Sequence, residues 1–136
     1  MSFDLRDHTA DVAVEATGKT LGDVFAATAD GMTGAMCDRI PPDGDRFDIE
    51  VSAESREALL FDYLDELIFQ RDIRGVLPIE HEATVTKDDD GWTVTGSARG
   101  VPLQRVSARE VKAVTYSQMQ LTHTDDGWRA YVVFDV

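Results

Sequence analysis

Two aspartate-glycine turns, each followed by a tryptophan, divide the second half of the chain into segments with strand-like patterns. The turns lie at residues 88–91 and 125–127, and Trp92 and Trp128 are the first residues of the segments that follow them. Aspartate followed by glycine favours the positive φ angles of a tight hairpin. The four flanking segments are residues 79–87, 92–99, 111–122 and 128–136. We therefore predict two β-hairpins in this half.

Two segments of the first half have the spacing of amphipathic helices. Thr20 can cap the first, with Asp23 three residues later, and Ser55 can cap the second, which Gly75 ends. The apolar positions are Leu21, Val24, Phe25, Thr28, Met32 and Met36 in the first helix, and Leu59, Leu60, Tyr63, Leu64, Leu67 and Ile68 in the second. Each stripe is expected to face the core.

A strand pattern precedes each helix, at residues 11–17 and 46–53, and the proline- and glycine-containing residues 40–45 form a connection. The order is therefore strand, helix, strand, helix and four strands. This order predicts an α+β fold, an antiparallel or mixed β-sheet with two α-helices packed on one face. No linker divides residues 1–136, so we expect a single domain.

Acidic residues outnumber basic residues by 26 to 13, and the formal net charge is -13. Proteins gain affinity for nucleic acids by neutralising phosphates with lysine and arginine, so this composition argues against direct sequence-specific nucleic-acid binding. Two explanations stay open. The diffuse acid excess resembles that of halophilic archaeal proteins, which tolerate self-repulsion in high salt, and it also suits an acidic face for a basic partner.

The opening residues contain no apolar segment like that of a secretory signal, and no apolar run approaches the roughly 18 residues of a membrane span. We expect a cytoplasmic protein that does not bind membranes. Cys37 is the only cysteine, which excludes an internal disulfide and a thiolate cage for zinc. It is expected to be a small buried residue on a helix.

No complete catalytic set is visible in the sequence. The P-loop, dinucleotide-binding, serine-hydrolase and zinc-protease signatures are absent. His8, His81 and His123 fall in different predicted elements, so they do not form a nucleophile-base set with a nearby serine or cysteine. His81 alternates with apolar residues and is expected to be a satisfied, partly buried imidazole, while His123 is expected at a strand end.

Asp7, His8 and Asp11 form a short polar cluster where the first strand begins. Carboxylates attract hard cations, but such cations need six or more oxygens, so further ligands must come from elsewhere. The alternative is an Asx turn in which Asp7 or His8 bonds the local backbone. A second source of oxygens is Asp135, which alternation places away from the core, together with the carbonyl and carboxylate of Val136.

Phe69 falls on the polar side of the second helix, between Asp62 and Asp65 on the helical wheel. An aromatic side chain in this position is either a rim residue covered by a neighbouring loop or an exposed anchor for a partner. The pattern leaves both interpretations open.

Three segments resemble the archease family. Residues 7–12, Asp-His-Thr-Ala-Asp-Val, resemble its amino-terminal signature, and residues 110–116, Glu-Val-Lys-Ala-Val-Thr-Tyr, are similar to its second signature. The last strand, ending in Val-Val-Phe-Asp-Val at residues 132–136, resembles its carboxyl terminus. The resemblance spans essentially the whole chain and includes both predicted helices.

The resemblance implies that the protein is not itself an enzyme but activates the RtcB-type tRNA-splicing RNA ligase, which seals exon halves using GTP. It implies that the protein promotes the covalent ligase-guanylate intermediate, supports repeated turnover and broadens which nucleoside triphosphate the ligase uses. It therefore predicts a role in tRNA splicing.

The resemblance also implies a metal site. Asp11 and Asp135 would supply carboxylate oxygens, and Val136 a carbonyl oxygen, to a divalent ion for which Ca²⁺ fits best and Mg²⁺ or Mn²⁺ are alternatives. The residues expected to support these ligands are Asp7, His8, Lys112 and Tyr116. After the tyrosine many archeases have histidine, whereas this chain has Ser117.

Two other functions remain open. A metal-dependent phosphoester hydrolase with Asp7, His8 and Asp11 as its active site would turn over a phosphoester by itself. A general chaperone or adaptor would depend on Phe69 and the acidic helix face, and not on the metal cluster.

Overall fold

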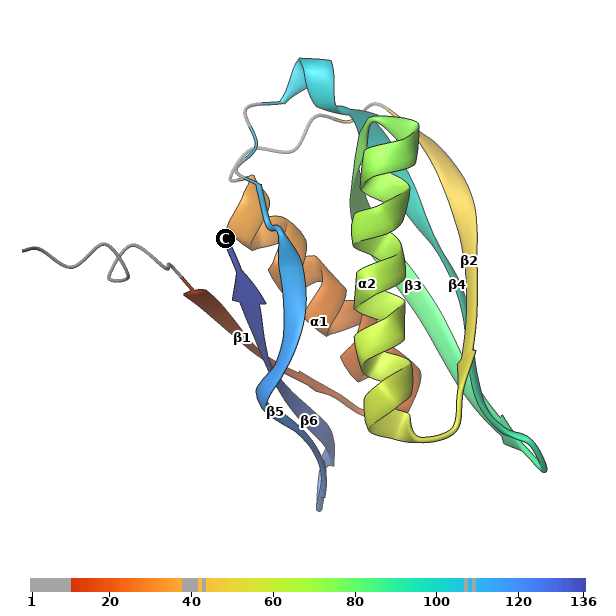
Figure 1. Ribbon diagram of the computed structural model, residues 1–136. Helices are drawn as coiled ribbons and strands as arrows, with labels where there is room; N and C mark the ends of the chain where they lie inside the picture. Colours follow the sequence, from red (N-terminus) through yellow and green to blue (C-terminus); the bar gives the residue numbers. More distant parts are fainter. Residues whose placement is uncertain (1–10, 38–41, 43, 107, 109) are drawn as a thin grey trace, which may run out of the picture.

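The computed structural model describes residues 11–37, 42, 44–106, 108 and 110–136 (Figure 1). Asp7, His8 and residues 40, 41 and 43 of the predicted connection lie outside these residues. The elements are β1 (Asp11–Gly18), α1 (Leu21–Met36), β2 (Asp45–Ala53), α2 (Arg56–Arg74), β3 (Val76–Asp88), β4 (Gly91–Pro102), the 3-10 helix η2 (Leu103–Arg105), β5 (Ala113–Thr124) and β6 (Gly127–Asp135).

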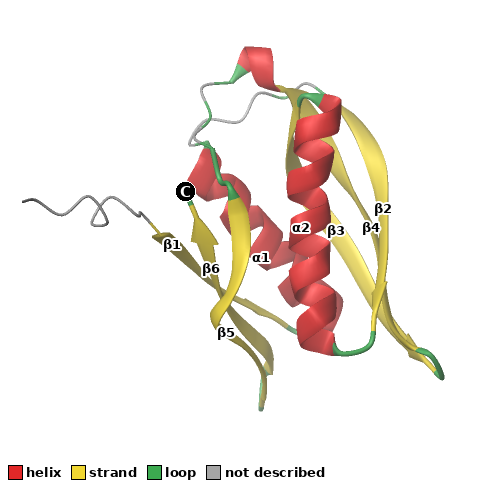
Figure 2. Cartoon of the chain, viewed as in Figure 1, coloured by secondary structure: helices red, strands yellow, loops and turns green. Residues whose placement is uncertain are grey.

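The strands of the described residues form two antiparallel three-stranded sheets, with the orders β1-β6-β5 and β2-β4-β3 (Figure 2). Each predicted hairpin supplies two neighbouring strands, and an earlier strand joins it at one edge. The α+β class and both helices are confirmed. The division into two sheets is a feature that the element order did not predict, because strand pairing depends on contacts between distant segments.

Each helix touches both sheets. α1 packs against β1 and β6 of one sheet and β3 of the other, whereas α2 packs against β5 and the three strands of the second sheet. The predicted apolar stripes face inward, and their side chains meet buried residues of the strands. The largest fully buried side chains include Tyr63, Phe25, Phe134, Met32, Met36, Leu59 and Leu60. The helices therefore join the two sheets around one core.

Local sequence signals set the helix ends as predicted. Thr20 accepts a hydrogen bond from the backbone of Asp23 at 3.0 Å, and the Asp23 carboxylate accepts one from the backbone of Thr20, which completes a capping box. Ser55 caps α2, and Gly75 ends it in the left-handed conformation with φ 65°. Cys37 is buried at the end of α1.

The hairpin turns lie where the sequence predicts them, but only the glycines have positive φ. Gly91 and Gly127 each have φ 139°, and the neighbouring aspartates keep negative φ. A Cβ atom at Gly91 would lie 2.6 Å from the carbonyl oxygen of Ala53, and one at Gly127 2.4 Å from that of Gly18. Both glycines are therefore required for close approach to a neighbouring chain segment as well as for the turn.

His81 lies at a bulge in β3, where Glu80 has φ 49°. The ring Nδ1 of His81 is 2.8 Å from an Asp30 carboxylate oxygen, which also accepts the His81 backbone N–H. The Nε2 atom is buried and has no hydrogen-bond partner among the described residues. The imidazole is thus more buried than the strand pattern predicts, and only one of its two ring nitrogens is hydrogen-bonded within the described part of the chain.

Arg56 connects the two sheets at the amino-terminal end of α2. Its guanidinium lies over the rings of Trp92 and Trp128, 5.7 Å and 5.0 Å from the two centroids. Because the tryptophans come from β4 and β6, one cation joins the two hairpins. No helix among the described residues is both long and apolar enough to cross a membrane.

We expect Arg56→Ala to lower the free energy of unfolding by about 1–2 kcal/mol, because each cation-π contact contributes roughly 0.5–1 kcal/mol. Urea unfolding followed by tryptophan fluorescence measures this change. Lys87→Ala is the matched control, since Lys87 lies over Trp92 alone, 5.4 Å from its centroid. An equal loss in the two variants would contradict the bridging role of Arg56.

Candidate functional site

The first and last strands bring two carboxylates together. Asp11 of β1 and Asp135 of β6 are direct register partners. Residues directly opposite each other in an antiparallel pair share a face, with Cβ atoms about 4.5–5.5 Å apart. The Asp11 side chain is exposed and that of Asp135 is half-buried, so both carboxylates are accessible at the same end of the sheet.

Alternation along β6 decides the direction of Asp135. Ala130, Val132 and Phe134 are buried in the core, which leaves the residues between them on the opposite face. This is the placement that the sequence pattern predicts. Val136 follows at once and is half-buried against the core, so its backbone is held next to the two carboxylates.

Backbone contacts hold this strand end in position. The backbone N–H of Lys112 donates to the carbonyl oxygen of Asp135 at 2.7 Å. The preceding residue, Val111, is fully buried, and its carbonyl oxygen accepts a hydrogen bond of 2.8 Å from Nη1 of Arg71 in α2. A buried arginine therefore connects the central helix to the segment that fixes Asp135.

Arg71 was not identified from the sequence, although a signal for it exists. It lies four residues after Leu67 and three after Ile68, so it continues the apolar stripe of α2 onto the core. Only 6% of Arg71 is exposed, and its Nε atom donates to the Asp72 carboxylate at 3.0 Å. Charged residues are rarely buried without a partner, so an arginine on the buried face of a helix indicates a structural or functional role.

The electrostatics at this strand end favour a cation. Within the described part of the chain, no lysine, arginine or histidine forms an ion pair with Asp11 or Asp135. Like charges directly opposite each other destabilise a strand pair. A hard divalent ion would remove this repulsion, and carboxylate and carbonyl oxygens are its preferred ligands. Asp11, Asp135 and the main-chain oxygen of Val136 therefore fit such an ion.

The described residues alone do not complete a coordination sphere. They contain no cluster of three or more histidine, cysteine or acidic side chains. Since a calcium ion takes six to eight oxygens, the remaining ligands must be water or residues outside the described part, which includes Asp7 and His8.

Tyr116 and Ser117 lie away from the carboxylate pair. Ala113 is the register partner of Asp135, so Tyr116 is roughly 10 Å further along β5. Its ring stacks on Phe61 of α2 with centroids 4.0 Å apart. Desolvation and the nearby Asp62 carboxylate raise the pKa of Tyr116. Ser117 is exposed in the bulge of β5, beside Gln118 with φ 61°.

Phe69 is 52% exposed on α2, and Ile73, one turn later, is 60% exposed. The third large exposed apolar side chain in the described part of the chain is Tyr116, which lies against the same helix. We call the solvent-facing side of α2 the outer stripe; its residues are the half-buried Asp62 and the exposed Asp65, Phe69, Asp72 and Ile73. The outer stripe thus combines apolar and acidic side chains.

The fold and the site define a class: a small α+β protein in which the first and last strands pair two carboxylates. The Archease protein family matches residues 3–136. The chain belongs to the archease family.

Relatives and solved structures agree with this assignment. Protein archease from Methanosarcina barkeri is 33% identical, over 98% of this chain and 95% of the relative, and that from Methanothermobacter thermautotrophicus is 34% identical, over 98% of each. The solution structure of Methanobacterium thermoautotrophicum protein 1598 superposes with a TM-score of 0.81 at 33% identity, covering 98% of this chain and 96% of that one. The crystal structure of a Thermotoga maritima archease, described as a possible chaperone, shares the fold with a TM-score of 0.67 at 21% identity, covering 95% and 93%.

Proposed function

We propose that this chain acts in the cytoplasm as a protein activator of an RtcB-type tRNA-splicing RNA ligase. It would promote guanylylation of the ligase, support multiple turnover and broaden its use of nucleoside triphosphates. Membership in the archease family supports a role through a protein partner. The observation that carries the proposal is the pairing of Asp11 with Asp135, which places two carboxylates opposite each other at one end of the sheet.

The carboxylates would hold a divalent ion, with Ca²⁺ as the best fit and Mg²⁺ or Mn²⁺ as alternatives. When bound, such an ion supplies positive charge that stabilises the phosphoryl oxygens on which nucleotidyl transfer concentrates negative charge. Asp11 and Asp135 would determine where the bound ion lies. The hydrogen bond from the Lys112 backbone N–H to the Asp135 carbonyl oxygen holds this strand end in position. The ligase itself would supply the nucleophile.

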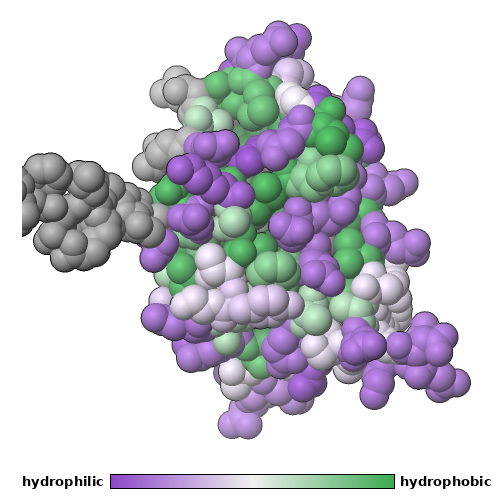
Figure 3. Space-filling view, viewed as in Figure 1, coloured by the Kyte–Doolittle hydropathy of each residue, from purple (hydrophilic) through white to green (hydrophobic). Residues whose placement is uncertain are grey.

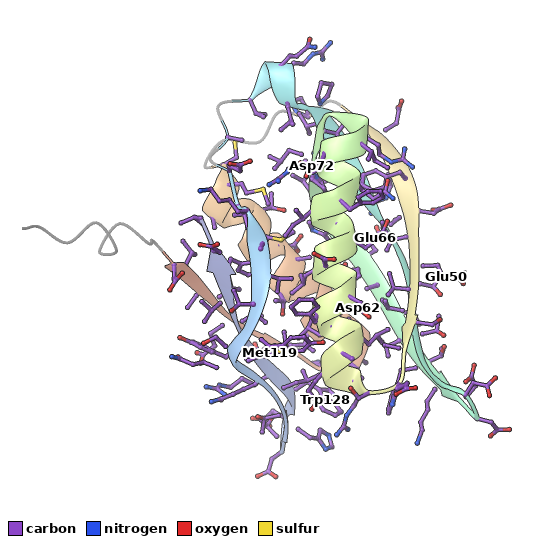
Figure 4. All side chains as sticks on the ribbon, in the orientation of Figure 1. Glu50, Asp62, Glu66, Asp72, Met119 and Trp128 are labelled. Carbon is purple, nitrogen blue, oxygen red and sulfur yellow. The ribbon has the colours of Figure 1, made fainter. Side chains whose placement is uncertain are left out.

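The outer stripe of α2 is the proposed docking surface for the ligase. Figure 4 shows Asp62, Glu66 and Asp72 along the length of this helix and Glu50 on the neighbouring β2. Figure 3 shows the same face of the molecule, on which hydrophilic and hydrophobic residues are interspersed. Exposed apolar anchors surrounded by carboxylates fit a partner with a basic surface around an apolar depression, and the charge would also raise the association rate.

A guanylylation assay tests the proposal directly. The ligase is incubated with labelled GTP, with and without this protein, while the divalent ion and the salt concentration are varied. The expected result is faster and more complete formation of the ligase-guanylate, dependent on the divalent ion. If the protein has no effect at any salt concentration, the activator function is wrong.

We expect Phe69→Ser combined with Ile73→Ser to weaken ligase binding by roughly 10-fold or more, because apolar anchors often contribute over 1 kcal/mol each. The free energy of unfolding should change by less than about 0.5 kcal/mol, since both side chains are exposed. Binding is measured by surface plasmon resonance. Asp88→Ser, at the tip of the β3–β4 hairpin, is the control and should bind like the parent. Unchanged affinity in the double variant would place docking elsewhere.

A further inference from the structure

The junction of α2 and β5 carries negative charge without a basic residue of its own. Residues 57–70 of α2 contain four carboxylates, at Glu57, Asp62, Asp65 and Glu66, and no lysine or arginine. β5 packs against α2 and also lacks both basic residue types (Figure 1). The junction is therefore locally negative, and neither element supplies a cation to offset the charge.

An aromatic pair lies at this junction. The Tyr116 ring of β5 stacks on the Phe61 ring of α2, with the centroids 4.0 Å apart and the planes 2° from parallel. Phe61 is half-buried and covers one face of the Tyr116 ring, whereas Tyr116 is 55% exposed. The other face of the Tyr116 ring is therefore accessible to a ligand.

Two carboxylates flank the aromatic pair. Desolvation and, to a smaller extent, the Asp62 carboxylate raise the pKa of Tyr116, so this carboxylate lies near the phenol. Asp65 lies four residues after Phe61, one turn further along the same side of the helix. Within the described part of the chain, no lysine, arginine or histidine forms an ion pair with Asp62 or Asp65. Both carboxylates are thus available to a cation from outside.

Three other aromatic rings have a cation from the chain itself. Arginine or lysine side chains lie 4.6–5.7 Å from the ring centroids of Phe47, Trp92 and Trp128. Among the described residues, no arginine or lysine lies over Phe61 or Tyr116. The exposed Tyr116 ring and the carboxylates beside it thus provide the groups of a cation-π site that the chain itself does not fill.

We propose that Tyr116, Asp62 and Asp65 receive an arginine side chain of a basic protein partner. The guanidinium group is planar, stacks on aromatic faces and pairs with carboxylates through two parallel hydrogen bonds. It is also more weakly hydrated than the ammonium group of lysine. One arginine therefore contacts both the accessible ring face and a carboxylate of α2. A phosphate-bearing RNA fits less well, because this junction has no lysine or arginine to neutralise phosphates.

This inference rests on the proposed docking of the ligase at the outer stripe, to which Asp62 and Asp65 belong. It adds the ring of Tyr116 to that surface and names the partner residue that the surface binds. The apolar anchors Phe69 and Ile73 lie further along the same helix, so the arginine contact and the apolar contact occupy different parts of α2.

Nuclear magnetic resonance titration of the intact protein tests the site with three pentapeptides that differ only in a central arginine, lysine or citrulline. Lysine keeps the charge without the planar group, and citrulline keeps the shape without the charge. We expect the arginine peptide to shift resonances of Tyr116 and of residues 61–65, and to bind about 2-fold or more tightly than the lysine peptide. The citrulline peptide should leave these resonances unshifted.

Tyr116→Leu should weaken binding of the arginine peptide by about 2- to 5-fold, which corresponds to the roughly 0.5–1 kcal/mol of an exposed cation-π contact. Tyr116→Phe should bind like the parent, because the ring face remains. Asp62→Asn should also weaken binding, and it tests the site independently if Tyr116→Leu disturbs the packing on Phe61. The matched control is Asp48→Asn, which makes the same change of charge on the exposed face of β2 and should bind like the parent.

The proposal is wrong if the arginine and lysine peptides bind alike, if Tyr116→Leu binds like Tyr116→Phe, or if Asp62→Asn binds like Asp48→Asn. It is also wrong if a short single-stranded RNA shifts Tyr116 and the arginine peptide does not, because the ring would then stack on bases. None of these titrations contains the ligase. Normal binding of the arginine peptide without any stimulation of ligase guanylylation would overturn the activator function but not the arginine site.

Discussion

Replacing both Asp11 and Asp135 by asparagine is expected to abolish the stabilisation of the protein by divalent ions. At a free Ca²⁺ concentration of 100 times its Kd, the parent should gain about 2.7 kcal/mol in the free energy of unfolding. The variant should gain nothing, because both carboxylate ligands are lost. Urea unfolding with and without Ca²⁺ measures the difference, and the same variant should no longer stimulate ligase guanylylation.

Without the ion, the double substitution should raise the free energy of unfolding rather than lower it. The two carboxylates are opposite each other and have no cationic partner among the described residues. Removing their repulsion should stabilise the ion-free variant by a few tenths to about 1 kcal/mol.

The matched control is Asp48→Asn combined with Glu50→Gln. It changes the net charge by the same amount on the exposed face of β2. The control should keep the gain from Ca²⁺. If the parent shows no gain from any divalent ion, or if the control loses the gain as well, the cation site is not at Asp11 and Asp135.

Arg71→Met is expected to lower both the stability of the fold and the affinity for the ion. The substitution leaves the buried carbonyl oxygen of Val111 without its donor from α2, which costs about 1–3 kcal/mol. The segment that fixes the Asp135 carbonyl through Lys112 is then less restrained. We expect the Kd for Ca²⁺ to rise by roughly 10-fold, an estimate that corresponds to about 1.4 kcal/mol.

A second variant separates positioning from a general loss of stability. Thr33 donates to the buried carbonyl oxygen of Pro78 at 2.7 Å, so Thr33→Val also removes a long-range donor from a buried carbonyl, but on the other sheet. Thr33→Val should lower the free energy of unfolding similarly and leave the Kd for Ca²⁺ unchanged. Arg71→Lys should partly restore the affinity, because the ammonium can still donate to Val111. Equal Kd values for Arg71→Met and the parent would rule out a positioning role.

Local signals explain the elements that could be predicted. The capping box at Thr20 and the left-handed Gly75 involve residues within one turn of the helix, so the sequence contains all the information they need. The positions of the hairpins were predictable for the same reason. The conformation of the turns was not, since Gly91 and Gly127 also approach carbonyl groups of distant segments.

The candidate site shows a similar division. The family resemblance selects Asp11 and Asp135, and strand alternation places Asp135 away from the core. Their register pairing joins the two ends of the chain, and only the folded sheet shows it. Tyr116 belongs to the second signature, but the structure places it against Phe61 rather than beside the carboxylates. Residues close in a sequence motif are not necessarily close to the same site.

The sequence by itself determined the helices with their caps, the two hairpins, the acidic charge and the α+β class, because these depend on periodicity, composition and neighbouring residues. Only the tertiary structure decided the division into two sheets, the contact of Arg71 with Val111 and the pairing of Asp11 with Asp135. The physical reason is that these features rest on contacts between segments far apart in the chain, whose geometry is set by the packing of the shared core rather than by local preference.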